Sequence, residues 1–171
     1  VFALDGSTIE LSSSAKINDR FPPAMNQNGT AAKGILHFLV AHDLESGYAA
    51  RPAYGAFFGK DLCTEAELCS QLLPRLPQDA ILVGDRNFGI FITAYAIKSR
   101  GCDLVVRLTE GRAKKIAKQA VNPGDDIAVT WTPSGDERKK YSSLSADAQI
   151  EGRVVSELVQ TRDGKQVQLT L

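Results

Sequence analysis

Short apolar runs separated by polar turns predict several strands along the first two thirds of this chain. Val1 to about Leu11 has the composition of a strand, and KGILHFLVAHD and GYAARPAYGAFF flank the turn sequence LESG as two further strands. DAILVGD and CDLVVRLT are short continuous apolar runs, the pattern of buried strands. The polar, proline-bearing stretch from Ser12 to Ala32 has no period, so we expect a long loop there.

Two segments have helical spacing instead. TEAELCSQLLPRL places its apolar residues on one stripe, with Thr64 as N-cap, Glu67 as its capping-box partner and Pro74 as an early stop. FGIFITAYAIKSRG ends on two cations and Gly101, which favour a helix C-terminus. A strand, helix and strand in succession imply a parallel pair of strands with a helical crossover, and therefore an α/β sheet.

From Glu110 onward the pattern becomes β-rich. EGRAKKIAKQAVNPGDD is basic and then turn-rich, IAVTWTP predicts a strand, and VVSELVQTRDGKQVQLTL predicts a hairpin with Asp163 and Gly164 at its tip. We therefore expect an α/β core in residues 1–109 and a β-rich subdomain in residues 110–171. The chain opens without Met inside a strand and closes on an alternating segment with nothing after it to pair with, so we expect a piece of a longer protein.

Composition narrows the classes of protein without naming a function. The 171 residues are 43% hydrophobic, enough for one substantial core, and 20 Lys and Arg balance 20 Asp and Glu. This balance gives no sign of a polyanionic partner, although a local basic face remains compatible with it. No apolar run reaches the roughly 20 residues of a membrane span, so we expect no membrane partner. Three cysteines without paired spacing suit a reducing compartment and structural roles.

Asp5 and Asp85 interrupt strand-like apolar segments, where a charge is costly unless it meets water, a cation or a metal. Each has an ordinary structural explanation. Asp85 or Asn87 can cap the following helix, and Asp5 with Gly6 is a common turn dipeptide. Ligands of open α/β sheets, however, bind outside the carboxyl ends of strands. Two carboxylates there suit Mg²⁺, a hard ion that prefers carboxylate and water oxygens.

Five segments, in this order, resemble the DDE transposases of bacterial insertion sequences, the IS-four type group. They are ALDGST, a polar loop with NQNG, HFLVAHDLESGYAARPAYG, ILVGDRNFG and DLVVRLT. The resemblance spans nearly the whole chain. It implies an α/β fold of the ribonuclease H-like kind, a mixed sheet with flanking helices, to which a β-rich insertion subdomain is added.

The resemblance implies that Asp5 and Asp85 are the first two members of an acidic triad that holds Mg²⁺ or Mn²⁺. In such enzymes two ions roughly 3.5–4 Å apart assist phosphodiester hydrolysis and strand transfer at transposon ends. The third member, a Glu in a Tyr-Arg-Glu-Lys helix, is absent from the sequence and expected beyond Leu171. We therefore expect a fragment of a DDE-type DNA transposase that is inactive alone. The parent is expected in the bacterial cytoplasm, as a dimer on double-stranded DNA.

Several residues are candidates for DNA contact. They are Arg86, Asn87, Arg112, Lys114, Lys115, Lys118 and Trp131. Arg86 can meet a phosphate or form a surface ion pair. The basic residues between 112 and 118 can neutralise phosphates, and a solvated charged face explains them equally well. The resemblance implies an aromatic residue in the insertion that stacks on a displaced base, for which Trp131 is the candidate. The alternative for Trp131 is a half-buried sheet position, and Phe88 is expected to be a core anchor.

Two other functions remain open. A metal-dependent nuclease or junction resolvase of ribonuclease H-like fold would only hydrolyse DNA, although a minimal nuclease core needs no β-rich insertion. A decayed or domesticated copy would be a DNA-binding module without activity.

Overall fold

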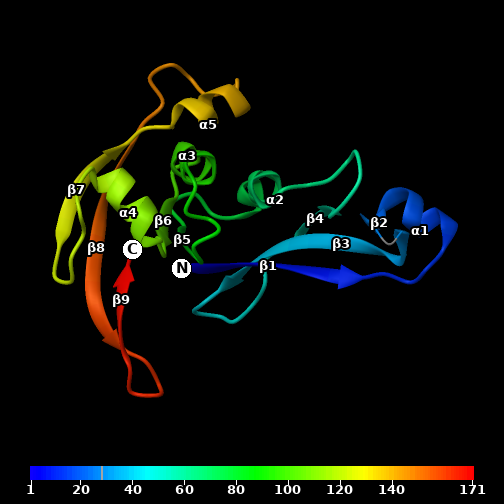
Figure 1. Ribbon diagram of the computed structural model, residues 1–171, viewed down its shortest axis with the longest axis horizontal. Coiled ribbons are helices and arrows are strands. Elements are labelled where there is room, and N and C mark those ends of the chain that lie inside the picture. Colours follow the sequence, from blue (N-terminus) through cyan, green and yellow to red (C-terminus); the bar gives the residue numbers. More distant parts are fainter. Residues whose placement is uncertain (28) are drawn as a thin grey trace. The chain divides into compact units, whose positions relative to one another are not determined.

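The computed structural model describes residues 1–27 and 29–171. The chain forms two compact units, Val1–Leu82 and Val83–Leu171, and Figure 1 traces both by colour. The boundary between these units lies inside a strand. The division of core from insertion at residue 109 stays a prediction.

The described residues form a mixed sheet of six strands and a second sheet of three. The larger sheet has the order β2-β3-β1-β5-β6, with β4 paired to β3. Its strands are β1 (Phe2–Glu10), β2 (Pro23–Asn26), β3 (Gly29–Asp43), β4 (Ala53–Ala56), β5 (Ile81–Gly84) and β6 (Asp103–Val106). The smaller sheet, of order β7-β8-β9, contains β7 (Asp126–Trp131), β8 (Ile150–Gln160) and β9 (Gln166–Thr170).

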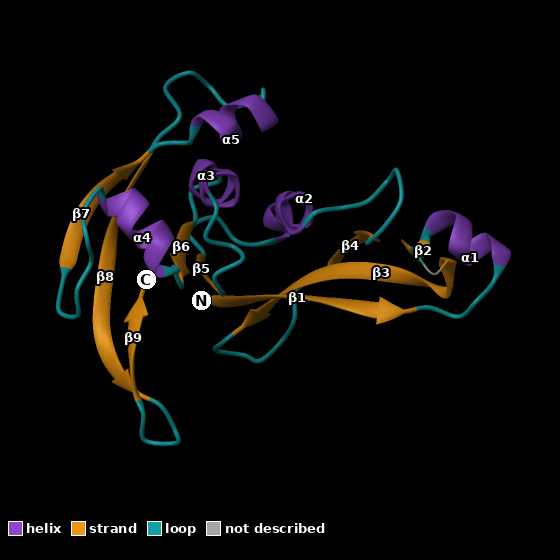
Figure 2. Ribbon diagram, viewed as in Figure 1, coloured by secondary structure: helices purple, strands orange, loops and turns teal. Residues whose placement is uncertain are grey.

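Helices flank these sheets, as Figure 2 shows in purple. They are α1 (Ala15–Arg20), α2 (Glu65–Leu72) with a 3₁₀ turn η1 (Leu73–Arg75), α3 (Phe91–Ser99), α4 (Glu110–Ala117) and α5 (Gly135–Lys140). The α/β class that the sequence predicts is confirmed. A mixed sheet with flanking helices is compatible with a ribonuclease H-like fold.

In the first unit, α2 packs on β3 and β4 and buries Leu68, Cys69 and Leu72. The capping box predicted at its start is confirmed, because the Thr64 hydroxyl accepts from the Glu67 amide at 3.3 Å and the Glu67 carboxylate accepts from the Thr64 amide at 2.7 Å. The helix ends at Leu72, where the chain tightens into η1, as expected ahead of a proline.

The prediction of a long loop from Ser12 to Ala32 is wrong. Ser14 caps α1 through its hydroxyl, which accepts from the Ile17 amide at 3.2 Å, and β2 then pairs with the first part of β3. Short polar elements like these have no apolar period, so the pattern of hydrophobic and polar residues does not predict them. Asn28, which belongs to the NQNG segment, lies outside the described residues.

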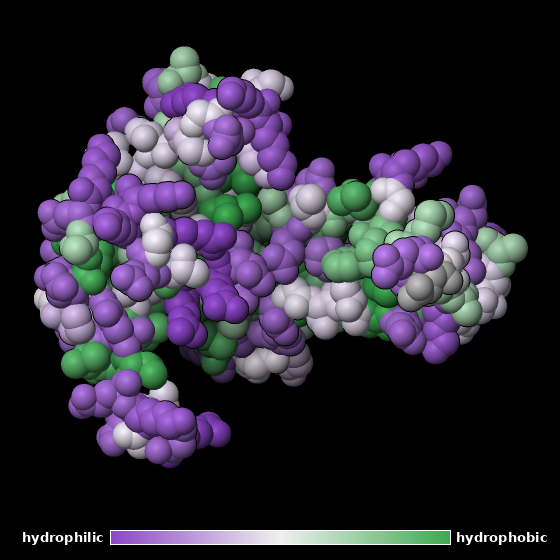
Figure 3. All heavy atoms as spheres, viewed as in Figure 1, coloured by the Kyte–Doolittle hydropathy of each residue, from purple (hydrophilic) through white to green (hydrophobic). Residues whose placement is uncertain are grey.

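In the second unit, α3 packs on β6 and β8, and α4 packs on β7 and β8. A buried cluster of Phe91, Ala94, Ala148 and Ile150 forms a core there. The β8–β9 hairpin turns at Gly164, which has a φ of 80°, as the sequence predicts. The expected β-rich character is incomplete, because α4 and α5 both interrupt this part of the chain. Figure 3 shows hydrophilic side chains over α5 and over the hairpin tip.

No helix within residues 1–27 and 29–171 has both the length and the apolar character needed to cross a bilayer.

Candidate active site

Asp5 lies within β1 and is exposed. Its partner in the antiparallel register is Val40 of β3, so Asp5 and Gly6 do not form a turn. The turn alternative for this dipeptide is therefore wrong. The neighbouring Leu4 is only 6% exposed, and successive residues of a strand point to opposite faces. Asp5 is thus a carboxylate held by a paired strand and directed away from the buried face of β1.

The Glu65 carboxylate lies close to β1 at Gly6. The sequence analysis did not identify this residue. A Cβ added to Gly6 would stand 2.9 Å from Glu65 Oε1, at the first residue of α2. A glycine is therefore the residue that leaves room for this side chain. Nothing in the spacing of the sequence connects Glu65 with β1, because the contact depends on how α2 packs.

Asp85 follows the last residue of β5 and is exposed. Its Oδ1 accepts a hydrogen bond from the Asn87 amide at 2.8 Å, which closes a local turn on the side chain. Helix α3 starts later, at Phe91, and its N-cap Ile90 has no side-chain cap. The capping alternative is therefore wrong for both Asp85 and Asn87. The turn leaves the carboxylate of Asp85 exposed at the carboxyl end of a strand.

The residues that follow Asp85 divide into core and surface. Phe88 is 2% exposed, which confirms it as a core anchor. It lies against the strand end, because a Cβ on Gly84 would stand 2.9 Å from the Phe88 ring. Arg86 and Asn87 are exposed. The backbone carbonyl of Arg86 accepts a hydrogen bond from the guanidinium of Arg112 in α4.

Asp5 and Asp85 each offer carboxylate oxygens, the donor type that Mg²⁺ prefers. Asp5 and Asp85 are exposed, so neither carboxylate must leave the protein interior to meet an ion. Mg²⁺ is usually held by one or two carboxylates together with water and substrate phosphates. No group of three or more His, Cys, Asp and Glu side chains is placed to hold a metal within the described part of the chain. Each carboxylate taken by itself is a donor of the kind that Mg²⁺ prefers.

A basic cleft of about 390 Å³ lies between α4 and the end of β7. Arg112, Lys115 and Lys118 contribute its cationic side chains, and Glu137 contributes an acidic one. The Glu137 carboxylate is occupied by a capping box, since it accepts from the Ser134 amide and hydroxyl at 2.8 Å each. The positive side chains therefore dominate this cleft. Lys114 is not among the residues that line it.

Trp131 forms part of the wall of the basic cleft and is half-buried. Its ring meets the Phe91 ring edge-on, with 5.6 Å between the two centroids. Trp131 therefore packs as a half-buried residue of a sheet, which is the alternative that the sequence offered. Its stacking on a displaced base stays a prediction.

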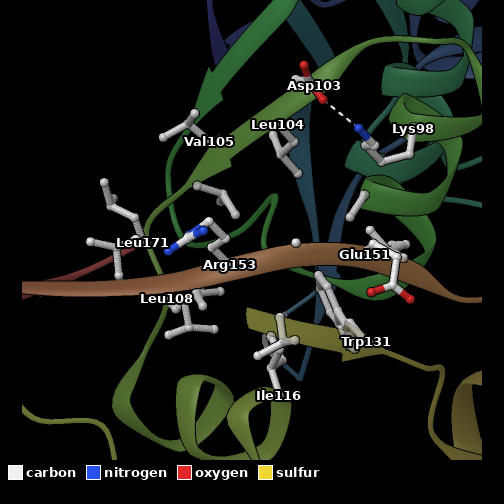
Figure 4. Close-up of a pocket in the computed structure, with 17 residues that line it drawn as sticks. Lys98, Asp103, Leu104, Val105, Leu108, Ile116, Trp131, Glu151, Arg153 and Leu171 are labelled. Atoms are coloured by element: carbon white, nitrogen blue, oxygen red, sulfur yellow. Dashed lines mark hydrogen bonds and ion pairs between the residues drawn. The ribbon is translucent and has the colours of Figure 1, made fainter. Parts of the chain in front are cut away.

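The second unit also contains an apolar cavity of about 380 Å³, shown in Figure 4. Leu104, Ile116 and Trp131 line it. The charged groups at its edge already have partners, and the Glu151 carboxylate accepts from the Thr130 hydroxyl at 3.0 and 3.1 Å. Lys98 Nζ lies 2.5 Å from Asp103 Oδ1, and Arg153 makes two bonds of 2.7 and 2.6 Å to Asp126, which lowers the pKa of the Asp126 carboxyl. This cavity therefore presents apolar surface and paired charges, and does not gather groups for acid–base chemistry.

The sequence also missed Arg107, which follows β6. Its backbone amide donates to the Gly84 carbonyl at 3.5 Å, beside Asp85 in the chain. The strand-like run VVRLT gave no reason to separate this arginine from its apolar neighbours.

Comparison with known proteins gives a fold but no family. No family model matches this chain, and no curated protein matches it. Among solved structures, the chain is similar to one in the cryo-EM structure of the piggyBac transposase synaptic complex with hairpin DNA. The TM-score is 0.50 and the identity is 12%, over 99% of this chain and 32% of that one. The chain thus has a transposase-like fold and spans about a third of that neighbour's length.

Proposed function

We propose that this chain is part of the catalytic domain of a DNA transposase, in which Asp5 and Asp85 hold Mg²⁺ or Mn²⁺. The placement of Asp85 carries the proposal. Its carboxylate is exposed after β5, and β5 stands next to β1, the strand of Asp5, in the order of the sheet. The transposase-like fold supports this assignment, and the basic cleft supports DNA as the substrate. The IS-four type relationship, the bacterial cytoplasm and a dimer on DNA remain parts of the same proposal.

In the proposed site, different residues hold the metal, orient its ligands and contact the DNA. Asp5 and Asp85 would hold Mg²⁺ through their carboxylate oxygens, and the ion would supply activation of an attacking water or 3′-hydroxyl and stabilisation of the leaving oxygen of a phosphodiester. The Asn87 amide orients the Asp85 carboxylate through its hydrogen bond to Oδ1. Lys115 and Lys118 offset the negative charge of the DNA backbone.

Mn²⁺ binding to the chain, followed by electron paramagnetic resonance, tests the metal site. Asp5→Asn and Asp85→Asn each remove one negative ligand, and we expect each to weaken Mn²⁺ binding by about tenfold or more, which is roughly 1.4 kcal/mol. Asp79→Asn is the matched control. Asp79 is exposed and has a φ of 65°, a conformation that Asn also adopts readily.

The outcome separates the candidate functions. If Asp5→Asn and Asp85→Asn bind Mn²⁺ as tightly as Asp79→Asn, the metal site is wrong. Retained DNA binding in that case would favour a DNA-binding module without activity. If metal binding holds and a longer form of the protein yields only hydrolysed DNA, the nuclease or resolvase alternative replaces the transposase.

A further inference from the structure

Two strands of the second unit each have an open edge. β6 stands at the end of the strand order, so no strand of the described residues pairs with its outer edge. β8 pairs with β7 along one edge from Ile150 to Val155, and with β9 along the other edge from Ser156 onward. Within the described part of the chain, the first half of β8 therefore has no partner strand on the β9 side.

Backbone hydrogen bonds show which groups of β6 face its outer edge. The Leu108 amide donates to the Thr170 carbonyl of β9 at 2.8 Å, whereas the preceding Arg107 amide donates to the end of β5. Successive residues of a strand direct their amides and carbonyls to opposite edges. Leu104 and Val106 therefore direct theirs to the same side as Leu108, away from β5.

The same alternation applies to β8. Val155 both donates to and accepts from Leu171, at 3.0 and 2.8 Å, on the β9 side. The Ser156 amide donates in the opposite direction, at 2.9 Å, to the residue before β7. Glu151 and Arg153 therefore direct their amides and carbonyls to the β9 side, where the first half of β8 has its open edge.

Both open edges border the apolar cavity of about 380 Å³ in Figure 4, whose lining includes residues 103–106 of β6 and 150–155 of β8. At one end of this cavity β9 already bridges the two strands, since Thr170 is bonded to Leu108 and Leu171 to Val155. Backbone polar groups away from water are almost always paired in native proteins. We call the space between the two open edges the strand slot.

We propose that the strand slot receives an extended segment of about four residues, which continues β9 in the longer protein and pairs with β6 and β8 at once. This length matches the four residues of β6. Segments that add to an open edge bind through main-chain hydrogen bonds, and the side chains around them select the sequence. The source of the segment rests on the proposed function, under which this chain is part of a larger domain.

The lining of the slot indicates the chemistry of the segment. Ile116 and Trp131 line the cavity, so the side chains that point toward them should be apolar. Lys98 is paired with Asp103, and Arg153 with its own carboxylate partner, so no unpaired charge is offered to a charged side chain. The segment therefore has the alternating pattern of a half-buried strand.

This segment would also connect the two parts of the proposed site. β6 belongs to the sheet that contains β5, the strand before Asp85, and β8 pairs with β7, which ends at the basic cleft. A strand bonded to both β6 and β8 holds the basic cleft in a fixed position relative to Asp85.

Hydrogen–deuterium exchange resolved to single amides tests the slot. In the 171-residue chain, the amides of Glu151 and Arg153 should exchange at least about tenfold faster than those of Gly152 and Val154, which face β7. In the longer protein they should slow to the rates of these neighbours. Equal rates in the 171-residue chain would overturn the open edge. Unchanged rates in the longer protein would overturn the segment as its occupant.

A capped five-residue peptide of alternating Thr and Val tests the slot without the longer protein. Trp131 is the only tryptophan and lines the cavity, so its fluorescence reports binding. A peptide N-methylated at every second amide should bind at least about tenfold more weakly, because it loses donors along one edge. Val105→Asp should weaken binding similarly. Val167→Asp is the matched control, since Val105 and Val167 are 38% and 39% exposed and only Val105 lines the cavity.

Four outcomes decide the proposal. No fluorescence change at millimolar peptide, or equal binding of the two peptides, would overturn strand pairing. Equal losses in Val105→Asp and Val167→Asp would overturn the slot as the binding site. A longer protein that binds the peptide as tightly as the 171-residue chain would overturn the source of the segment, because its slot would be open. If Asp85→Asn leaves Mn²⁺ binding intact while the slot amides are protected in the longer protein, only the proposed function fails.

Discussion

Gly34 of β3 lies against Phe21, the C-cap residue of α1. A Cβ at this position would stand 2.1 Å from the carbonyl oxygen of Phe21, which is backbone and cannot turn aside. Gly34 also donates its amide to Asn18 Oδ1 at 3.1 Å and accepts from the Leu11 amide at 2.9 Å. Three segments of the first unit therefore meet at a residue without a side chain.

Gly34→Ala should lower the free energy of unfolding by about 1–3 kcal/mol, the usual cost of overpacking. Urea unfolding followed by circular dichroism measures this. Gly111→Ala is the matched control, because a Cβ on Gly111 meets nothing within 4 Å and the residue lies in α4. That change should stabilise the protein by about 0.5–1 kcal/mol, since Ala is the better helix former. A Gly34→Ala protein as stable as the unaltered one would refute this contact.

Cys69 lies on the buried stripe of α2 and is 1% exposed. Burial disfavours the charged thiolate and raises the pKa of the Cys69 thiol to about 12. The reactive form is the thiolate, so Cys69 should stay unmodified by iodoacetamide at pH 8 while the protein is folded. The partly exposed Cys63 should react first. Mass spectrometry of the digested protein, with a urea-unfolded sample as control, distinguishes the two. Equal modification of both in the folded protein would contradict this assignment.

At the scale of elements, α4 offers a direct comparison between adjacent lysines. Lys114 and Lys115 are both exposed, but only Lys115 lines the basic cleft. Lys118 ends the helix with a φ of 58°, a left-handed position usually taken by glycine, and it also lines the cleft. The helix thus directs some of its cations into the cleft and leaves at least one outside.

Lys115→Ala should therefore weaken DNA binding by about fivefold, roughly 1 kcal/mol, whereas Lys114→Ala should change it by less than about twofold. Anisotropy titrations at one fixed salt concentration measure both. Equal losses would mean that the face binds through general charge, which is the solvated-face alternative. Both substitutions remove one charge from an exposed position of the same helix and place Ala there, so differences in helix stability should be small.

The elements also show how far the sequence could lead. Three elements were predictable because their signals are local. The α2 capping box depends on a cap and its partner, the α3 helix on an apolar period, and the β8–β9 hairpin on a turn dipeptide. By contrast, α4 follows a plain N-cap at Thr109 that was overlooked, and α1 and β2 have no apolar stripe. For the candidate site, Asp85 was found from its strand end, whereas the hydrogen bond that its carboxylate accepts from the Asn87 amide was not predicted. Arg107 was missed because tertiary packing alone joins it to the end of β5. Packing also brings Glu65 to Gly6, on the face of β1 opposite Asp5.

At the scale of the whole molecule, charge is divided unevenly between the two units. Residues 83–171 contain 14 Lys and Arg against 11 Asp and Glu, a net charge of +3, and residues 1–82 contain 6 against 9, a net charge of −3. The neutral total therefore combines an acidic unit with a basic one, and the basic unit contains Asp85 and the basic cleft. The sequence alone did not reveal this, because the sum depends on where the boundary lies.

This division predicts the salt dependence of DNA binding. If Arg86, Arg107, Lys115 and Lys118 each neutralise one phosphate, the logarithm of the binding constant should fall with the logarithm of salt concentration at a slope of about −3 to −4. Anisotropy titrations from low to moderate salt give this slope, and Arg162→Ala, an exposed position near the tip of the β8–β9 hairpin, should leave it unchanged. A slope near −1 would mean that these side chains do not act together on one strand. A slope steeper than about −7 would require a much larger basic surface than these four residues provide.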